Sequence, residues 1–147
     1  YLVADREVGA VLMHNQRGRE HHDVIDDITS GFITSLSVCD SAGVDSAKLI
    51  LDPGFGFGWS VSQNLEILRR LPELVHLELP LLIGTSKKSS IGTVLGSRVG
   101  ERLFGTAATV AHAICAGIDV VRIHDGSEMR DVVTMSDAIV RQRGSVG

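Results

Sequence analysis

The stretch LDPGFGFGWS, residues 51–60, holds an aspartate at the end of an apolar run and then alternates glycines with large aromatic side chains. Glycine gives the backbone conformational freedom and lets another group approach it closely. Phe and Trp need either apolar cover or a flat ligand on which to stack. Together with Asp52, these residue types predict a loop that is built around a planar, hydrogen-bonding ligand.

On both sides of this loop, short apolar runs alternate with segments whose apolar residues recur every three or four positions. The runs predict strands over 10–14, 48–52, 80–84 and 119–123, and the periodic segments predict helices over 23–42, 61–71 and 105–116 and a last helix, capped by Ser127 or Asp125, that ends at about 141. Ser60 and Gln63 fit a capping box before the second helix. Strands separated by helices indicate a parallel sheet, because parallel strands need crossover connections. We therefore expect one α/β domain over residues 1–147, with its ligand site at the carboxyl ends of the strands.

The composition is that of an ordinary globular domain, with 147 residues of which 44% are hydrophobic and 22% charged. The net charge of −4 argues against a nucleic-acid-binding protein, which usually carries a basic face. No apolar run reaches the ~20 residues that span a membrane, and no signal peptide is recognisable, so we expect a cytoplasmic protein without a membrane partner. Cys39 and Cys115 lack metal-site spacing and are expected to be two buried thiols. Because the sequence starts at Tyr1, within what looks like the end of a helix, we expect a fragment of a longer protein.

Three strand ends carry residues of definite chemistry. Asp52 can accept two N–H bonds from an aminopyrimidine-like edge, although a loop-capping role would also suit it. The sequence SKKS, Ser86 to Ser89, begins a helix, where N–H groups and two lysines can hold an anion; an ordinary solvated turn is the alternative. Arg122 and His124 lie on the same side of a strand by two-residue alternation and together can hold a phosphate.

The remaining strand end, Met13-His14, is weaker evidence of a site, since Met at a strand end is more often part of a core. The sequence contains no GxSxG elbow and no GxxxxGK[ST] or GxGxxG phosphate loop. A Ser-His-Asp triad or a nucleotide-binding loop is therefore not indicated.

Five motifs resemble those of dihydropteroate synthase: LMHNQRG (12–18), LDPGFGFG (51–58), LLIGTSKKSSIG (81–92), GTAATVAHA (105–113) and VVRIHD (120–125). They follow the family's order through nearly the whole chain. The resemblance implies a (β/α)8 barrel of TIM type, of which this chain would supply about half, strands five to eight with their helices. It also implies a transferase of folate biosynthesis that condenses 6-hydroxymethyl-7,8-dihydropterin diphosphate with p-aminobenzoate, giving 7,8-dihydropteroate and pyrophosphate. Mg²⁺, bound mainly through the substrate diphosphate, and a homodimer of the full-length protein are implied as well.

The resemblance further assigns pterin-side roles at matching positions. Asp52 would bind the pyrimidine edge of the pterin, and Met13 would line the pterin slot. Lys88 would hydrogen-bond the pterin ring, while Arg122 would stack on it and, with His124, bind the diphosphate. Asp52, Lys88, Arg122 and His124 are the expected catalytic residues.

On the side of p-aminobenzoate, the resemblance implies that Phe57 and Lys87 flank the substrate and that Ser89 receives its carboxylate at the start of a helix. Gly56, in the same glycine-rich loop as Phe57, is a further expected substrate-binding position. These four positions complete the predicted site.

The chain also departs from the family pattern. The first half of the family's barrel is missing, so the chain alone is expected to be nearly inactive. Trp59 stands where the family has a lysine, which removes a cation and is expected to place a bulky ring at the mouth of the site. Lys87 replaces an arginine and so keeps the charge but loses planar stacking. Trp59 leaves open a non-catalytic pterin-binding paralogue, and a pterin-dependent methyltransferase-like module shares the fold and ligand class, although SKKS counts against it.

Overall fold

The computed structural model describes residues 2–6, 8–15 and 23–141 of the chain. Within these ranges four short strands run in parallel: β1 (Ala10–Met13), β2 (Leu49–Asp52), β3 (Leu82–Ile83) and β4 (Val120–Val121). β1 pairs with β2 and β3 with β4, while a single bridge between Leu51 and Leu81 joins the two pairs. The parallel direction is the one that the alternating sequence pattern predicts, and the strands follow one another in space in chain order.

β3 and β4 are shorter than the predicted strands over 80–84 and 119–123. Pro80 has no N–H to give to a neighbouring strand, and the N–H of Leu81 donates to the side chain of Asp119 at 3.0 Å instead of to a backbone carbonyl. The Leu81 carbonyl in turn accepts from the N–H groups of Asp119 and Val120. A side chain thus takes the place of one ladder bond, and the regular pairing starts only at Leu82.

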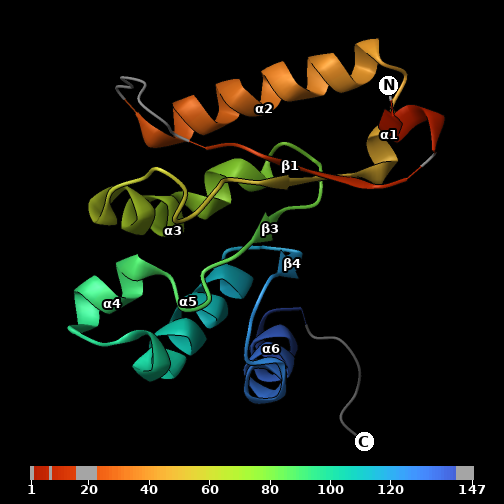
Figure 1. Cartoon of the computed structure of the whole chain (residues 1–147). Helices are drawn as coiled ribbons and strands as arrows, with labels where there is room; N and C mark the ends of the chain where they lie inside the picture. The colour runs from red at the N-terminus through yellow and green to blue at the C-terminus, as the bar shows by residue number, and fades with distance from the viewer. Residues whose placement is uncertain (1, 7, 16–22, 142–147) are drawn as a thin grey trace, which may run out of the picture.

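In the described part of the chain, six α-helices connect and flank the strands: α1 (Leu2–Asp5), α2 (Val24–Ser41), α3 (Val61–Val75), α4 (Ser89–Leu95), α5 (Leu103–Cys115) and α6 (Gly126–Arg141). Two 3₁₀ turns, Ser46–Lys48 and Val99–Glu101, lie in the connections. The chain steps from α2 and β1 at one side, through α3 and β3, to β4, α5 and α6 at the other (Figure 1). Packing of α2 on α3 and of α5 on α6 makes a helical layer outside the strands.

The helix starts are fixed by the caps that the sequence contains. Asp23 accepts hydrogen bonds from the N–H groups of Ile25 and Asp26 at 2.8 and 3.0 Å and so caps α2. Ser60 and Gln63 form the predicted capping box of α3, each side chain accepting the other's backbone N–H. Both predicted helix starts are confirmed.

α3 extends to Val75, beyond the predicted end at residue 71, and passes through Pro72. Proline inside a helix deprives the carbonyl four residues earlier, here that of Leu68, of its N–H partner. Nε2 of His112 on α5 lies 2.9 Å from this Leu68 oxygen. Because a carbonyl oxygen only accepts, Nε2 is the donor, and a neighbouring helix replaces the hydrogen bond that the proline removes.

The core lies between the strands and the helices. Among its members are Ile28, Phe32, Leu51, Phe55, Trp59, Ile67, Leu71, Leu81, Ile83 and Ile118. The expectation of two buried thiols is wrong, because Cys39 is half-buried and Cys115 is exposed at the end of α5; both are free. Within the described ranges, no helix combines the length and the apolar character needed to cross a membrane.

Candidate functional site

Asp52 ends β2 as a buried carboxylate with 3% of its surface exposed. Its Oδ1 accepts the N–H of Gly54 at 2.8 Å. Burial raises the pKa of Asp52, while the Gly54 N–H and the positive charges of Arg122 and Lys88 act in the opposite direction. The side chain is therefore a desolvated acceptor within the field of two cations, an arrangement suited to a ligand that donates N–H bonds.

A pocket of about 430 Å³ opens at the carboxyl ends of β3 and β4, and we call it the strand-end pocket. It is lined by Gly84, Ser86, Lys88, Arg122, Ile123 and His124. Its charged lining side chains, Lys88 and Arg122, are cationic, and they sit beside His124 at the edge where the sequence pattern places a ligand. Such a lining suits an anionic group.

Arg122 packs against the backbone of Gly84, where an added Cβ would lie only 3.0 Å from Nη2 and 3.1 Å from Nε. A glycine at this position thus makes room for the planar guanidinium. Two residues further, His124 is held by Ser86, a buried residue whose Oγ accepts the His124 N–H at 3.2 Å and lies 2.9 Å from Nδ1. Ser86 is a positioning residue that the sequence analysis included only as part of the SKKS motif.

Lys88 connects the strand-end pocket to the loop over residues 53–59, called the glycine loop below. Its Nζ lies 3.7 Å from the centre of the Phe57 ring, a cation–π contact. The stem packs on Gly56, where a Cβ would come within 2.8 Å of Cδ. The pKa of Lys88 is lowered by burial and by the charge of Arg122, while Asp52 raises it.

Lys87 points to the start of α6, where its Nζ lies 2.6 Å from Oδ1 of Asp125. Its backbone is in the left-handed region, with φ of 57°. The N–H of Lys87 donates to Thr106 Oγ1 at 3.1 Å, and its carbonyl accepts from Arg102 Nη1 at 2.8 Å. Arg102 and Thr106 therefore fix the SKKS turn; Thr106 lies in the GTAATVAHA motif but was assigned no role there, and the sequence pattern gave no indication of Arg102.

The other predicted positions are more open. Ser89 is exposed as the first residue of α4, and Phe57 and Gly56 are half-buried. Met13 is 38% exposed and pairs with Asp52 across β1 and β2. The structure thus gathers Asp52, Lys88, Arg122 and His124 at one edge, with the glycine loop beside them.

The loop itself is held by Asn64, which the sequence analysis missed. Asn64 is 1% exposed, its Oδ1 accepts the Gly56 N–H at 2.7 Å, and its Nδ2 donates to the carbonyls of Trp59 and Ser60. The sequence could have indicated Asn64 through its position on the buried face of α3, because a buried amide needs hydrogen-bond partners.

Trp59 lies in the core and not at the mouth of the site, so that expectation is wrong. The residue is 7% exposed, and its ring N–H donates to the Pro53 carbonyl at 3.3 Å. Phe55 is likewise 2% exposed. Two of the loop's three aromatic rings therefore find apolar cover within the protein, and only Phe57 faces the cationic side chains.

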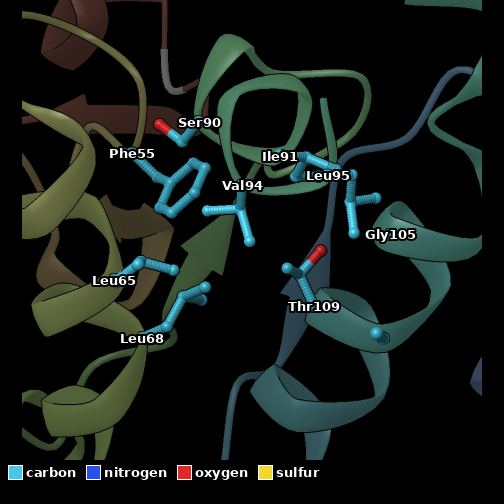
Figure 2. Close-up of a pocket in the computed structure, with 10 residues that line it drawn as sticks. Phe55, Leu65, Leu68, Ser90, Ile91, Val94, Leu95, Gly105 and Thr109 are labelled. Atoms are coloured by element: carbon cyan, nitrogen blue, oxygen red, sulfur yellow. The ribbon is translucent and has the colours of Figure 1, made fainter. Parts of the chain in front are cut away.

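A second pocket, of about 160 Å³, lies between α3, α4 and α5, and we call it the helix-layer pocket. Phe55, Leu65 and Leu68 face Ile91, Val94 and Leu95 across it, with Gly105 and Thr109 at its α5 side (Figure 2). Its lining contains no charged side chain. The two pockets thus differ in chemistry, and the polar residues singled out by the sequence gather at the strand-end pocket.

The described residues include no group of three or more His, Cys, Asp or Glu side chains that could hold a metal ion. The charged lining of the strand-end pocket is basic, which does not fit a resident Mg²⁺, a cation that prefers carboxylate and other oxygen ligands. The protein groups at this edge are instead suited to the anion that would accompany such a metal.

Comparison with known proteins gives a consistent result. The family model "Pterin binding enzyme" matches residues 1–124. Dihydropteroate synthase of Bacillus subtilis is 38% identical over 143 residues, which cover 97% of this chain and 50% of the relative. The Escherichia coli K12 enzyme is 39% identical over 146 residues, which cover 93% of this chain and 52% of the relative. The chain thus spans about half the length of these curated relatives.

Solved structures agree with the sequences. A dihydropteroate synthase of Clostridium difficile, determined in the presence of pteroic acid, superposes with a TM-score of 0.92 at 42% identity, covering 95% of this chain and 54% of the other. A Yersinia pestis dihydropteroate synthase with a pterine-sulfa conjugate gives a TM-score of 0.90 at 35% identity, covering 95% and 55%. From the family match, supported by these likenesses in fold, the chain belongs to the pterin binding enzymes.

Proposed function

We propose that this chain is the C-terminal half of a dihydropteroate synthase, which condenses 6-hydroxymethyl-7,8-dihydropterin diphosphate with p-aminobenzoate to give 7,8-dihydropteroate and pyrophosphate. The observation that carries the proposal is the buried Asp52 carboxylate, with Lys88 and Arg122 acting on its charge beside an open pocket. Its support is the likeness to dihydropteroate synthases, one of them determined with pteroic acid present.

On the pterin, Asp52 accepts N–H bonds from the pyrimidine edge. These bonds add to the one that Oδ1 already accepts from Gly54 and compensate the desolvation of the buried carboxylate, which makes ligand binding favourable. Lys88 donates to the ring, Arg122 stacks on it and Met13 closes the slot from β1. The cation–π contact with Phe57 and the packing on Gly56 keep the Lys88 ammonium at the pocket.

On the diphosphate, Arg122 and His124 stabilise the negative charge that develops as the bond between the pterin methylene carbon and the diphosphate oxygen breaks. The bonding electrons leave with the diphosphate, and positive charge develops on the pterin. The amine nitrogen of p-aminobenzoate then forms the new carbon–nitrogen bond and loses a proton. Ser86 holds the His124 ring in place for this step.

For p-aminobenzoate, we propose that Phe57 provides an apolar wall, with Gly56 making room beside it. Ser89 and the charge of Lys87 face the carboxylate of the substrate. Because the Lys87 ammonium lies 2.6 Å from Asp125, the substrate carboxylate and Asp125 share one cation in this arrangement. The position of Trp59 in the core removes one argument for the non-catalytic paralogue, the bulky ring at the mouth of the site, although the cation of the family's lysine is still absent.

The parallel order β1-β2-β3-β4 supports a half-barrel that four further strands would close. We propose that the complete protein is a homodimer. We also propose that Mg²⁺ arrives with the diphosphate and neutralises part of its charge, since the described residues lack a carboxylate cluster to hold it.

The test is p-aminobenzoate-dependent pyrophosphate release by a protein that joins this chain to the other half of the barrel. Arg122→Ala should lower kcat by about 100-fold or more, because it removes a group that stabilises transition-state charge. Arg98→Ala is the matched control, since the Arg98 side chain is 90% exposed and pairs with Glu101 away from the pocket. Pyrophosphate release that does not require p-aminobenzoate, or equal rates in the two variants, would contradict the proposal.

A further inference from the structure

His14, directly after β1, is enclosed and has no part in the function proposed above. Its Nε2 lies 2.7 Å from Oδ2 of Asp27 on α2, with the two side chains 8% and 15% exposed. The ring stands edge-on to Phe32 at a centroid distance of 6.5 Å and lies 6.1 Å from the Trp59 ring. Because the Asp27 carboxylate accepts, Nε2 carries the proton.

The helix α2 can approach this ring only because residue 31 is glycine. A Cβ at Gly31 would overlap three atoms of the His14 imidazole. The separation between α2 and the end of β1 is therefore set by the imidazole, and Asp27, one turn before Gly31, fixes the orientation of the ring.

The backbone of the same histidine holds the start of the glycine loop. Its N–H donates to the Asp52 carbonyl at 2.9 Å. Its carbonyl oxygen lies against Gly54, where φ is +71° and a Cβ would overlap that oxygen. Gly54 in turn donates its N–H to Oδ1 of Asp52. An unbroken chain of contacts thus leads from Asp27, through His14 and Gly54, to the carboxylate at the site.

We propose that Asp27 and His14 form a positioning clamp that fixes the start of the glycine loop and so orients the Asp52 carboxylate. Neither side chain touches the ligand; Asp27 acts through His14, and His14 acts through Gly54 and the Asp52 backbone. The proposal deepens the proposed function, on which it rests for what Asp52 binds. A histidine that only filled the core would affect stability throughout the chain and would not act selectively on the loop.

The test compares Asp27→Ala with Asp26→Ala, its exposed neighbour in the first turn of α2, so that both variants lose one charge at the same helix start. Hydrogen exchange is measured at the Gly54 amide and at amides of α5. In Asp27→Ala we expect Gly54 to exchange about tenfold faster, the loss that follows from one charge-assisted hydrogen bond, with α5 unchanged. Asp27→Asn, whose Oδ1 can still accept from Nε2, should recover most of the protection.

Affinity for 6-hydroxymethylpterin gives a second readout, expected to fall about tenfold in Asp27→Ala and to stay within twofold in Asp26→Ala. Equal Gly54 exchange in the two variants, or acceleration at Gly54 and α5 alike, would overturn the clamp. The affinity is measured in the protein that joins this chain to the other half of the barrel, and failure of that unaltered protein to bind the pterin would contradict the proposed function instead. The exchange rates would still decide whether the clamp exists.

Discussion

Two histidines follow strands at the same edge of the molecule, and the structure uses them in opposite ways. His14 after β1 is 9% exposed and pairs with Asp27, whereas His124 after β4 is exposed and contacts Ser86. The difference comes from the helix that follows. α2 crosses the ring at Gly31, while α6 begins at Gly126 and leaves His124 open to the pocket. A strand-end position alone therefore does not identify a ligand-binding histidine; the covering helix decides.

The largest effect is expected at the strand end that α2 covers, where His14 follows β1. Gly54→Ala should cost about 3 kcal/mol of unfolding free energy, because a Cβ at φ +71° is strained and also overlaps the His14 carbonyl oxygen. Gly43→Ala is matched in strain, with φ of +75°, but its Cβ meets nothing within 4 Å, so about 1 kcal/mol is expected. Urea denaturation measures both. Equal losses would show that the close approach to His14 is not a real constraint.

The next effect compares the two histidines directly. His14→Ala should cost about 2 kcal/mol, since it opens a cavity and leaves Asp27 without its ring partner. His124→Ala should stay within about 0.5 kcal/mol, as expected of an exposed side chain, because Ser86 keeps the backbone N–H of residue 124 as a donor. Thermal or urea unfolding of the two variants checks this. A similar loss of unfolding free energy in both variants would contradict the distinction between the covered His14 and the exposed His124.

The smallest effect is expected in the pH dependence of stability, which differs in sign between Asp52 and Asp23. Burial raises the pKa of Asp52 above its ordinary 3.8, so the folded state favours the protonated form. The free energy of unfolding of the unaltered chain therefore falls as pH rises from 3.8 through the pKa that Asp52 has in the folded state. Over that range the stability of Asp52→Asn should rise relative to that of the unaltered chain. Asp23 has the opposite sign, because its bond to Arg70 lowers its pKa, so the chain should lose stability relative to Asp23→Asn as pH falls below 3.8.

Urea denaturation of these variants over a pH series measures the two trends. Parallel curves for the two substitutions, or an advantage of Asp52→Asn that shrinks as pH rises, would contradict the assigned environment of Asp52. The expected trend also means that the site carries a carboxylate at some cost to stability, which is common for functional groups.

Much of this arrangement could be predicted from the sequence. The alternation of apolar runs and periodic segments predicts that the strands run in parallel, and local side chains such as Ser60 and Gln63 predict where a helix starts. The cluster of Asp52, Lys88 and Arg122 follows from strand ends meeting at one edge. These features depend on residues that are close in sequence or on a general property of parallel sheets.

What could not be predicted depends on contacts between distant segments. The sequence around Pro72 indicates a helix end, but His112 from α5 supplies the missing donor. Trp59 beside a glycine-rich run suggests a ligand-facing ring, but the Pro53 carbonyl and the core accommodate it. The pairing of His14 with Asp27 likewise joins two elements whose separation the sequence does not state.

The most direct test of the account is to join this chain, labelled with ¹⁵N, to the other half of the barrel and to follow its backbone amide shifts during a titration with 6-hydroxymethylpterin. The account predicts saturable shifts gathered at Gly54, Gly84, Lys88 and Arg122, with α2 beyond Asp27 unaffected. Shifts gathered instead at Ile91, Gly105 and Thr109, in the helix-layer pocket, would contradict it. So would the absence of any saturable shift, because the strand-end pocket would then not bind the pterin.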